Sequence, residues 1–260
     1  MKVLSFGGGV QTVTMVAMCI NGDLPKPDFV IFADPQWESQ ATYDYMDKLK
    51  PMMFNAGMPL ITRTRGSIRK DALSGARFAT MPVFTSIDGK GGMLLRQCTN
   101  DYKIQVVMKA IREKMGVAKY KRVKEPVELW LGISIDEASR MKPSRTAWIT
   151  NKYPLIDKNM DRSNCIAYLK RKGFEIPPKS ACIGCPFHSD DFWKRLQKES
   201  PKEFEDACQF DDAIRTNACR KGKREADIFL HRSLKPLRSV KFDDGNMELF
   251  GNECEGHCGL

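Results

Sequence analysis

The sequence contains no apolar run of the length that a membrane span needs. No stretch approaches the ~18 consecutive apolar residues required to cross a bilayer. Nothing at its start resembles a signal peptide, because residues 1–6 lead directly into a glycine turn. Internal repeats and low-complexity tracts are also absent. We therefore expect a cytoplasmic protein that has no membrane partner.

Composition favours a folded domain that binds a polyanion. The chain has 260 residues, of which 42% are hydrophobic, so it can bury a substantial core and is not globally disordered. Its formal net charge of +10 at pH 7 favours ligands such as nucleotides or nucleic acid. Nine cysteines in a reducing compartment are seldom disulfides, so their spacing must sort them into packing residues, metal ligands or reactive thiols.

The pattern of apolar residues predicts an α/β fold. Lys2–Phe6 and Asp28–Asp34 are short β-rich runs, and Val10–Ile20 between them has one apolar helical face. Further strands are expected over Pro59–Thr64 and Val127–Ile133. Strands separated by helices imply a parallel sheet that is covered by helices on both faces.

Three more helices are expected. One follows Cys98, with Asn100 as its cap and Gly116 just past its end. The others cover Phe192–Lys198 and Glu203–Thr216, where apolar residues recur at spacings of three and four.

A glycine-rich turn between the first strand and the first helix is the strongest sign of a phosphate site. Glycines there allow backbone N–H groups to close around a phosphate at a helix N-terminus. The turn lacks the Gly-Lys-Ser/Thr ending of a Walker loop and the spacing of a dinucleotide fingerprint. A tight strand-to-helix turn without a ligand is the alternative. The candidate phosphate-binding residues are Ser5, Gly7, Gly8, Gly9, Gln11 and Thr12.

Carboxylates follow two of the predicted strands. Asp34 and Glu38 lie where the second strand ends, at the edge of the sheet where open α/β proteins bind ligands. A solvated acidic turn is the alternative. Asp136 and Glu137 follow a later strand and would bind Mg²⁺ near phosphates or cap the next helix.

Three cysteines have the character of metal ligands. Cys182 and Cys185 have ligand spacing in a proline-containing loop that could wrap a metal. Cys98 precedes a helix, whose amide ends lower a thiol pKa and favour an anionic cluster. An iron–sulfur cluster and a zinc ion completed by His188 both fit this set.

Five of the six other cysteines divide into buried and terminal ones. Cys19, Cys165 and Cys208 lie on apolar helix faces and are interpreted as small buried hydrophobes. Cys254 and Cys258 lie in a polar terminal segment, and reactive thiols are one interpretation of them. A disordered end, or a second metal site, is the alternative for that segment.

These motifs together resemble the adenine nucleotide α-hydrolase group and, within it, the phosphoadenylyl-sulfate (PAPS) reductase family. The glycine turn is similar to that family's modified phosphate loop, and Asp34 to Glu38 is similar to the segment after its second strand. Further similar segments follow in the same order and extend the resemblance over roughly residues 1–190. They are Arg96, Cys98 and Lys103, then Gly132 to Arg140, Tyr153 to Asp157, and the Cys182–Cys185 pair.

The resemblance implies a Rossmann-like nucleotide-binding domain over residues 1–176 and a helical, cysteine-containing extension over residues 177–260. Lys103 and Arg140 lie near these motifs and could hold phosphate oxygens of the nucleotide through charge-assisted hydrogen bonds, with surface solvation as the alternative. The resemblance also implies a 4Fe-4S cluster held by Cys98, Cys182 and Cys185, with Zn²⁺ as the alternative. Three thiolates would leave one iron of such a cluster open to an external ligand.

Three functions are compatible with this pattern. We favour ATP-dependent, adenylating sulfur transfer, because Gln97 and Ser134 depart from the reductase pattern. The alternative is a PAPS or APS reductase in which Cys254 or Cys258 is the nucleophile, and Gln11 is more similar to that form. A zinc-stabilised, non-enzymatic nucleic-acid-binding module is the third.

The expected partners follow from these functions. They are an adenine nucleotide, a thiol donor or sulfur carrier protein, and a nucleic-acid acceptor. The basic runs Lys109 to Lys124 and Arg220 to Arg224 could bind such an acceptor, although charge runs usually mark solvated faces.

Overall fold

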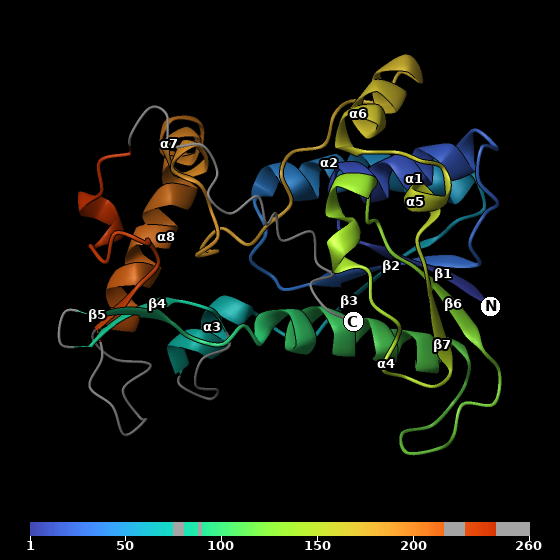
Figure 1. Ribbon diagram of the computed structural model, residues 1–260, viewed down its shortest axis with the longest axis horizontal. Helices are drawn as coiled ribbons and strands as arrows, with labels where there is room; N and C mark the ends of the chain where they lie inside the picture. The colour runs from blue at the N-terminus through green and yellow to red at the C-terminus, as the bar shows by residue number, and fades with distance from the viewer. Residues whose placement is uncertain (75–80, 88–89, 216–226, 243–260) are drawn as a thin grey trace.

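The computed structural model contains a five-stranded parallel sheet with helices on both faces (Figure 1). It describes residues 1–74, 81–87, 90–215 and 227–242. The strand order is β3-β2-β1-β6-β7, and every neighbouring pair is parallel. This confirms the predicted α/β fold. The strands are β1 (Lys2–Phe6), β2 (Phe29–Asp34), β3 (Leu60–Thr64), β6 (Val127–Trp130) and β7 (Ile149–Lys152).

The central strands carry apolar residues on both faces because helices cover both faces of the sheet. Leu4 and Phe32 pack toward one helical layer, whereas Val3 and Ile31 pack toward the other. Strand β6 is shorter than the predicted run to Ile133, since pairing ends at Trp130 and the chain then turns toward the site.

The first helical layer consists of α1 (Val10–Ile20), α2 (Gln40–Asn55), α5 (Pro154–Asp157) and α6 (Arg162–Arg171). Figure 1 shows this layer above the sheet. Side-chain caps fix where two of its helices begin. Ser39 accepts a bond from the Thr42 amide at the start of α2, and Asp161 forms a reciprocal capping box with Asn164 at the start of α6.

Helix α4 (Gln105–Lys114) covers the opposite face and packs Val106, Val107 and Ile111 against the strands. It differs from the prediction at its start. A π-helical segment, η1 (Thr99–Ile104), precedes it, and Cys98 already has a helical backbone. Asn100 therefore lies inside the helical segment and is not its cap, and its side chain instead donates to the Asp101 carboxylate at 3.0 Å.

A second lobe lies beside the sheet, on the left of Figure 1. It has its own core, centred on Trp193 and Phe210. Both helices predicted in this region are confirmed, each starting two residues earlier, and Ser189 caps the first of them by accepting from the Phe192 amide. Its elements are α3 (Ile68–Ser74), α7 (Asp190–Glu199), α8 (Pro201–Ala213) and an antiparallel sheet of β4 (Phe84–Ile87), β5 (Lys90–Met93) and β8 (Asp227–Phe229).

The interpretation of the helix-face cysteines as core residues is confirmed. Cys19 and Cys165 are buried in the first helical layer, and Cys208 is buried in the second lobe. No helix in the described part of the chain is long and apolar enough to cross a membrane.

Candidate functional site

The glycine turn lies where the sheet reverses its strand order. It follows β1, whose neighbours are β2 on one side and β6 on the other. Open α/β sheets form ligand crevices at the carboxyl ends of strands at such a position. Gly8 has a φ of +80°, a left-handed conformation that glycine adopts without strain. The turn therefore presents its backbone at the start of α1, as a phosphate site requires.

Three side chains from separate segments meet beside this turn. The Gln11 amide donates to the hydroxyl of Ser134 at 3.4 Å and accepts from the Arg162 guanidinium at 3.4 Å. Gln11 and Ser134 are buried, whereas Arg162, at the start of α6, reaches the same crevice from the surface. Arg162 was not predicted, because no sequence motif links the start of α6 to the first turn.

The loop that carries the two cysteines docks directly on the glycine turn. Ser180 donates its hydroxyl to the Gly7 carbonyl at 2.5 Å and lies 3.3 Å from a carboxylate oxygen of Glu38. Glu38 and Cys182 form an antiparallel β-bridge. The glycine turn and the cysteine loop therefore adjoin each other.

Gly184 explains how the loop can approach so closely. A Cβ built on Gly184 would lie 2.1 Å from Cη2 of Trp37, which is far inside contact distance. The Ile183 amide donates to the Trp37 carbonyl at 2.8 Å, and the indole N–H of Trp37 donates to Asp206 at 2.7 Å. The tryptophan thus lies against the cysteine loop and is tied to α8.

Glu38 forms a buried ion pair with Lys103. The two side chains approach to 3.8 Å, and the Glu38 side chain is 1% exposed. A buried carboxylate requires such a partner, since an isolated charge would cost far more free energy to desolvate. Two residues predicted for the nucleotide site are therefore brought together, at the boundary between the glycine turn and the cysteines.

The three predicted metal ligands are electrostatic neighbours. Burial raises the pKa of the Cys182 thiol well above its ordinary value, and the charges of Glu38, Cys185 and Cys98 raise this pKa further. Among the described residues, no group of three or more Cys, His, Asp or Glu side chains is gathered tightly enough to hold a metal ion. The donor set has the thiol chemistry of an iron–sulfur ligand set, but it is not assembled as one here.

His188, the fourth ligand of the zinc alternative, has other partners. Its Nε2 atom lies 2.9 Å from the Cys182 carbonyl oxygen, and its ring stacks on Phe192 with centroids 3.6 Å apart. Burial lowers the pKa of His188 to about 3, so the ring is neutral. His188 supports the turn of the cysteine loop through these contacts.

A cavity of about 490 Å³ opens at the N-terminal ends of α1, α2, α6, α7 and α8. Arg162, Lys179 and Arg195 supply positive charge to its wall. Asp191, Glu199 and Glu203 line it as well. The helix N-termini favour an anion in this cavity, whereas the cations and carboxylates of its wall are equal in number.

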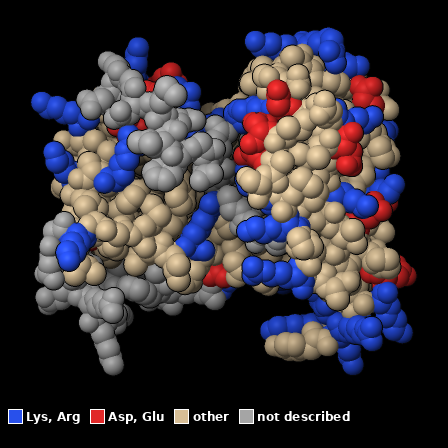
Figure 2. Space-filling view, in the orientation of Figure 1, with Lys and Arg blue, Asp and Glu red and all other residues tan. Residues whose placement is uncertain are grey.

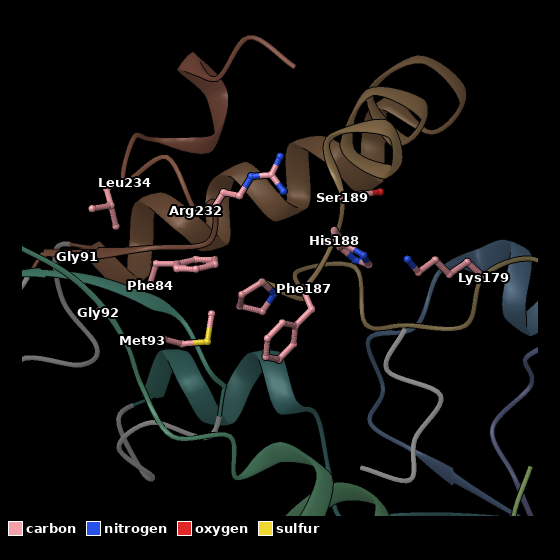
Figure 3. A pocket seen from close by; sticks show the side chains of 11 residues that line it. Phe84, Gly91, Gly92, Met93, Lys179, Phe187, His188, Ser189, Arg232 and Leu234 are labelled. Atoms are coloured by element: carbon pink, nitrogen blue, oxygen red, sulfur yellow. The ribbon is translucent and has the colours of Figure 1, made fainter. Parts of the chain in front are cut away.

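A second cavity of about 480 Å³ lies on the other side of the cysteine loop (Figure 3). Phe84, Met93 and Phe187 surround it, and Lys179 extends toward His188. Lys179 and Ser189 line both cavities, which therefore adjoin. A largely apolar wall with a few cationic groups is typical of small-molecule sites.

The remaining predicted residues have other partners or lie outside the described residues. Asp34 accepts bonds from the Tyr43 hydroxyl and the Gln36 amide, both at 2.7 Å. Arg140 forms an ion pair with Glu137. Asp136 accepts a bond from the Arg162 amide at 3.1 Å, in the first turn of α6, whose cap is Asp161. The candidate nucleophiles Cys254 and Cys258, and the basic run over residues 220–224, fall outside the described part of the chain.

No family model and no curated protein matches the chain. Its structure is similar to that of a phosphoadenylyl-sulfate (PAPS) reductase from Candida auris, solved as a phosphate complex. The two share 15% sequence identity, with a TM-score of 0.43 over 68% of this chain and 74% of the other.

Proposed function

We propose that this chain is an enzyme that binds an adenine nucleotide at the glycine turn and carries out ATP-dependent sulfur transfer beside the cysteine loop. The docking of that loop on the turn carries the proposal. The Ser180 bond to Gly7 and the Glu38–Cys182 bridge join the glycine turn to the loop that carries Cys182 and Cys185. A purely structural strand-to-helix turn does not require cysteines beside it.

The nucleotide phosphates would lie over the glycine turn at the N-terminus of α1. The backbone amides there supply donors, and the helix end favours negative charge. Arg162 and Lys179 stand in the adjoining cavity, where each can bond to a phosphate oxygen. Arg162 already contacts Gln11, so phosphate binding would need only a small adjustment of its side chain.

The thiol side of the site would serve the sulfur. Cys98, Cys182 and Cys185 would hold the iron–sulfur cluster that the sequence predicts, and such a cluster supplies an iron that can bind an external sulfur. The protein's own contribution is to exclude water and fix the loop. Cys182 is packed against the second-lobe core, and the Lys103–Glu38 pair balances charge beside it.

The reaction balances without a redox step when the donor is hydrosulfide. The carbonyl oxygen of the acceptor attacks the α-phosphorus of ATP, and pyrophosphate leaves. Hydrosulfide then adds to the activated carbon, its proton passes to solvent, and the carbon–oxygen bond breaks to release AMP. The acceptor gains a carbon–sulfur double bond in place of its carbon–oxygen double bond.

The decisive experiment supplies the protein, purified without oxygen, with ATP, hydrosulfide and pooled transfer RNA or DNA. We expect AMP and pyrophosphate in equal amounts, together with sulfur incorporated into the nucleic acid. Lys103→Met removes the cation of the buried Glu38–Lys103 pair. Lys50→Met removes an exposed cation on the surface of α2 and is the matched control. ATP that is neither bound nor consumed under these conditions would rule the proposal out.

A parallel assay with PAPS distinguishes the reductase alternative from sulfur transfer. PAPS would then leave a sulfonate on Cys254 or Cys258, which mass spectrometry can locate, and a thiol donor would release sulfite from it. Formation of this adduct, with no AMP produced from ATP, would assign the site to sulfonucleotide reduction instead of sulfur transfer.

A further inference from the structure

A basic groove runs along α4 and shares no lining residue with the two cavities of the site. Its volume is about 790 Å³, and it is bounded by the edge strand β3 and by the loop after α4. Five cationic side chains line it against two acidic ones. The cations are Arg63, Arg65, Lys109, Arg112 and Lys119, and the acids are Asp101 and Glu113.

The acidic residues hold the cations in place without cancelling them. Glu113 contacts Arg63 at 3.2 Å and Lys109 at 3.9 Å, and Asp101 lies 3.9 Å from Arg65. The Lys109 side chain is 80% exposed. Exposed pairs of this kind contribute little to stability, so an external phosphate can compete for the cations.

The loop after α4 extends the positive charge. Residues 109–124 contain seven Lys or Arg and a single acidic residue, whereas the whole chain has 42 basic and 32 acidic residues. Figure 2 shows Lys and Arg gathered over this loop, at the lower right of the molecule. Arg112 fixes the loop through guanidinium bonds of 2.6 Å to the Ala118 carbonyl and 2.7 Å to the Lys121 carbonyl.

Tyr120 stands at the tip of this fixed loop. Its side chain is 89% exposed, and its φ is +68°, a conformation that non-glycine residues rarely adopt. The Lys121 amide bonds to the Ala118 carbonyl at 3.1 Å, so Tyr120 occupies the third position of a turn where glycine is preferred. The Lys119 ammonium lies 4.8 Å from the ring centroid. An exposed aromatic ring in a strained backbone serves neither packing nor turn formation, which indicates a role in binding.

We infer that the α4 groove and the Tyr120 loop form a binding surface for single-stranded nucleic acid. Cations spaced along a groove follow a phosphate backbone, and an exposed aromatic ring stacks on an unpaired base. An acidic protein partner would use the charges but would not need the ring. Paired bases of a duplex would not offer a free face to it.

The groove leads toward the candidate site, and this step rests on the proposed function. Arg65, at one end of the groove, follows the carboxyl end of β3. The glycine turn follows the carboxyl end of β1, and because the strands are parallel, both lie at the same end of the sheet. The other end of the groove lies at the Tyr120 loop, beyond a ten-residue helix about 15 Å long. A single nucleic-acid strand bound along α4 would thus place one of its nucleotides near the site.

The test measures fluorescence anisotropy of labelled single-stranded RNA and DNA, about 15 nucleotides long, with the full chain and without ATP. We expect binding that weakens as salt is raised. Tyr120→Gly should weaken it about 5- to 100-fold, the range of one base stack, while the melting temperature stays constant or rises because the backbone strain is relieved. Lys109→Gln with Lys119→Gln should reduce the slope of log K against log salt by about 1.4.

Two control variants distinguish binding at this surface from attraction to positive charge elsewhere on the protein. Tyr120→Phe should bind like the wild type, and so should Lys198→Gln with Lys202→Gln on the surface of the second lobe. Wild-type affinity in Tyr120→Gly, equal affinity for duplex, or equal affinity for poly-glutamate would overturn the inference. Tight binding of single-stranded nucleic acid without sulfur transfer would refute the proposed function but not the binding surface.

Discussion

Ser180 donates its hydroxyl to the carbonyl oxygen of Gly7 at 2.5 Å, although 173 residues separate the two in the chain. The bond ties the cysteine loop to the turn that presents α1. Ser180 is buried, and its oxygen also lies close to Glu38. One hydroxyl group therefore links the glycine turn, the buried carboxylate and the segment that carries Cys182.

Ser180→Ala should weaken ATP binding about fivefold. A hydrogen bond of this kind contributes about 1 kcal/mol, and its loss would leave the turn less firmly held. Titration calorimetry with ATP measures the effect. Ser74→Ala is the matched control, since Ser74 makes a similar bond to a backbone carbonyl at 3.1 Å far from the site. Equal affinities for wild type and Ser180→Ala would show that the bond does not support the turn.

Gly184→Ala should separate the loop from Trp37. The added methyl group would lie 2.1 Å from the ring, and overpacking of this kind costs about 1–3 kcal/mol. Urea unfolding measures the loss of stability, and calorimetry should show weaker ATP binding. Gly22→Ala adds a methyl group into open space at a φ of +80°. It should lose stability through backbone strain but bind ATP normally, and a similar binding loss in both variants would contradict this account.

Protein purified without oxygen should be brown and contain iron. Cys182→Ser should lose that iron, because an alcohol replaces one of the predicted thiolate ligands. Elemental analysis and the visible spectrum give the result. Cys208→Ser is the control, since Cys208 is buried in the helical core of the second lobe and should leave the iron content unchanged. A colourless protein rich in zinc would reject the cluster.

Stability should decline as the pH falls below about 6.5. Burial lowers the pKa of His231, whose Nε2 contacts Asp190 at 3.1 Å, and it lowers the pKa of His188 to about 3. As the pH falls, these histidines bind protons in the unfolded chain before they do so in the folded chain. The free energy of unfolding that the neutral histidines contribute is therefore present above the unfolded pKa and is lost on acidification. Urea unfolding from pH 5 to 8 measures the slope, which His231→Gln should reduce. A slope that this substitution leaves unchanged would exclude His231 as a source.

Local sequence patterns determined the parallel sheet and the position of its glycine turn. Apolar runs such as Lys2–Phe6 are too short for buried helices, and the amphipathic segment Val10–Ile20 must cover what they expose. The glycines between them identify the turn, because a backbone that approaches a ligand leaves no space for side chains. Cysteine spacing likewise indicated a common role for Cys182 and Cys185.

Only the tertiary structure decided which residues share the site. The partners of Gln11, Glu38 and Gly7 come from segments that no local pattern connects to them, namely Arg162, Lys103 and Ser180. The groove along α4 also arises only when β3 and the α4 loop are brought together. Such contacts depend on how whole elements pack, and the free energy of that packing is spread over many distant residues instead of being encoded in any one stretch of chain.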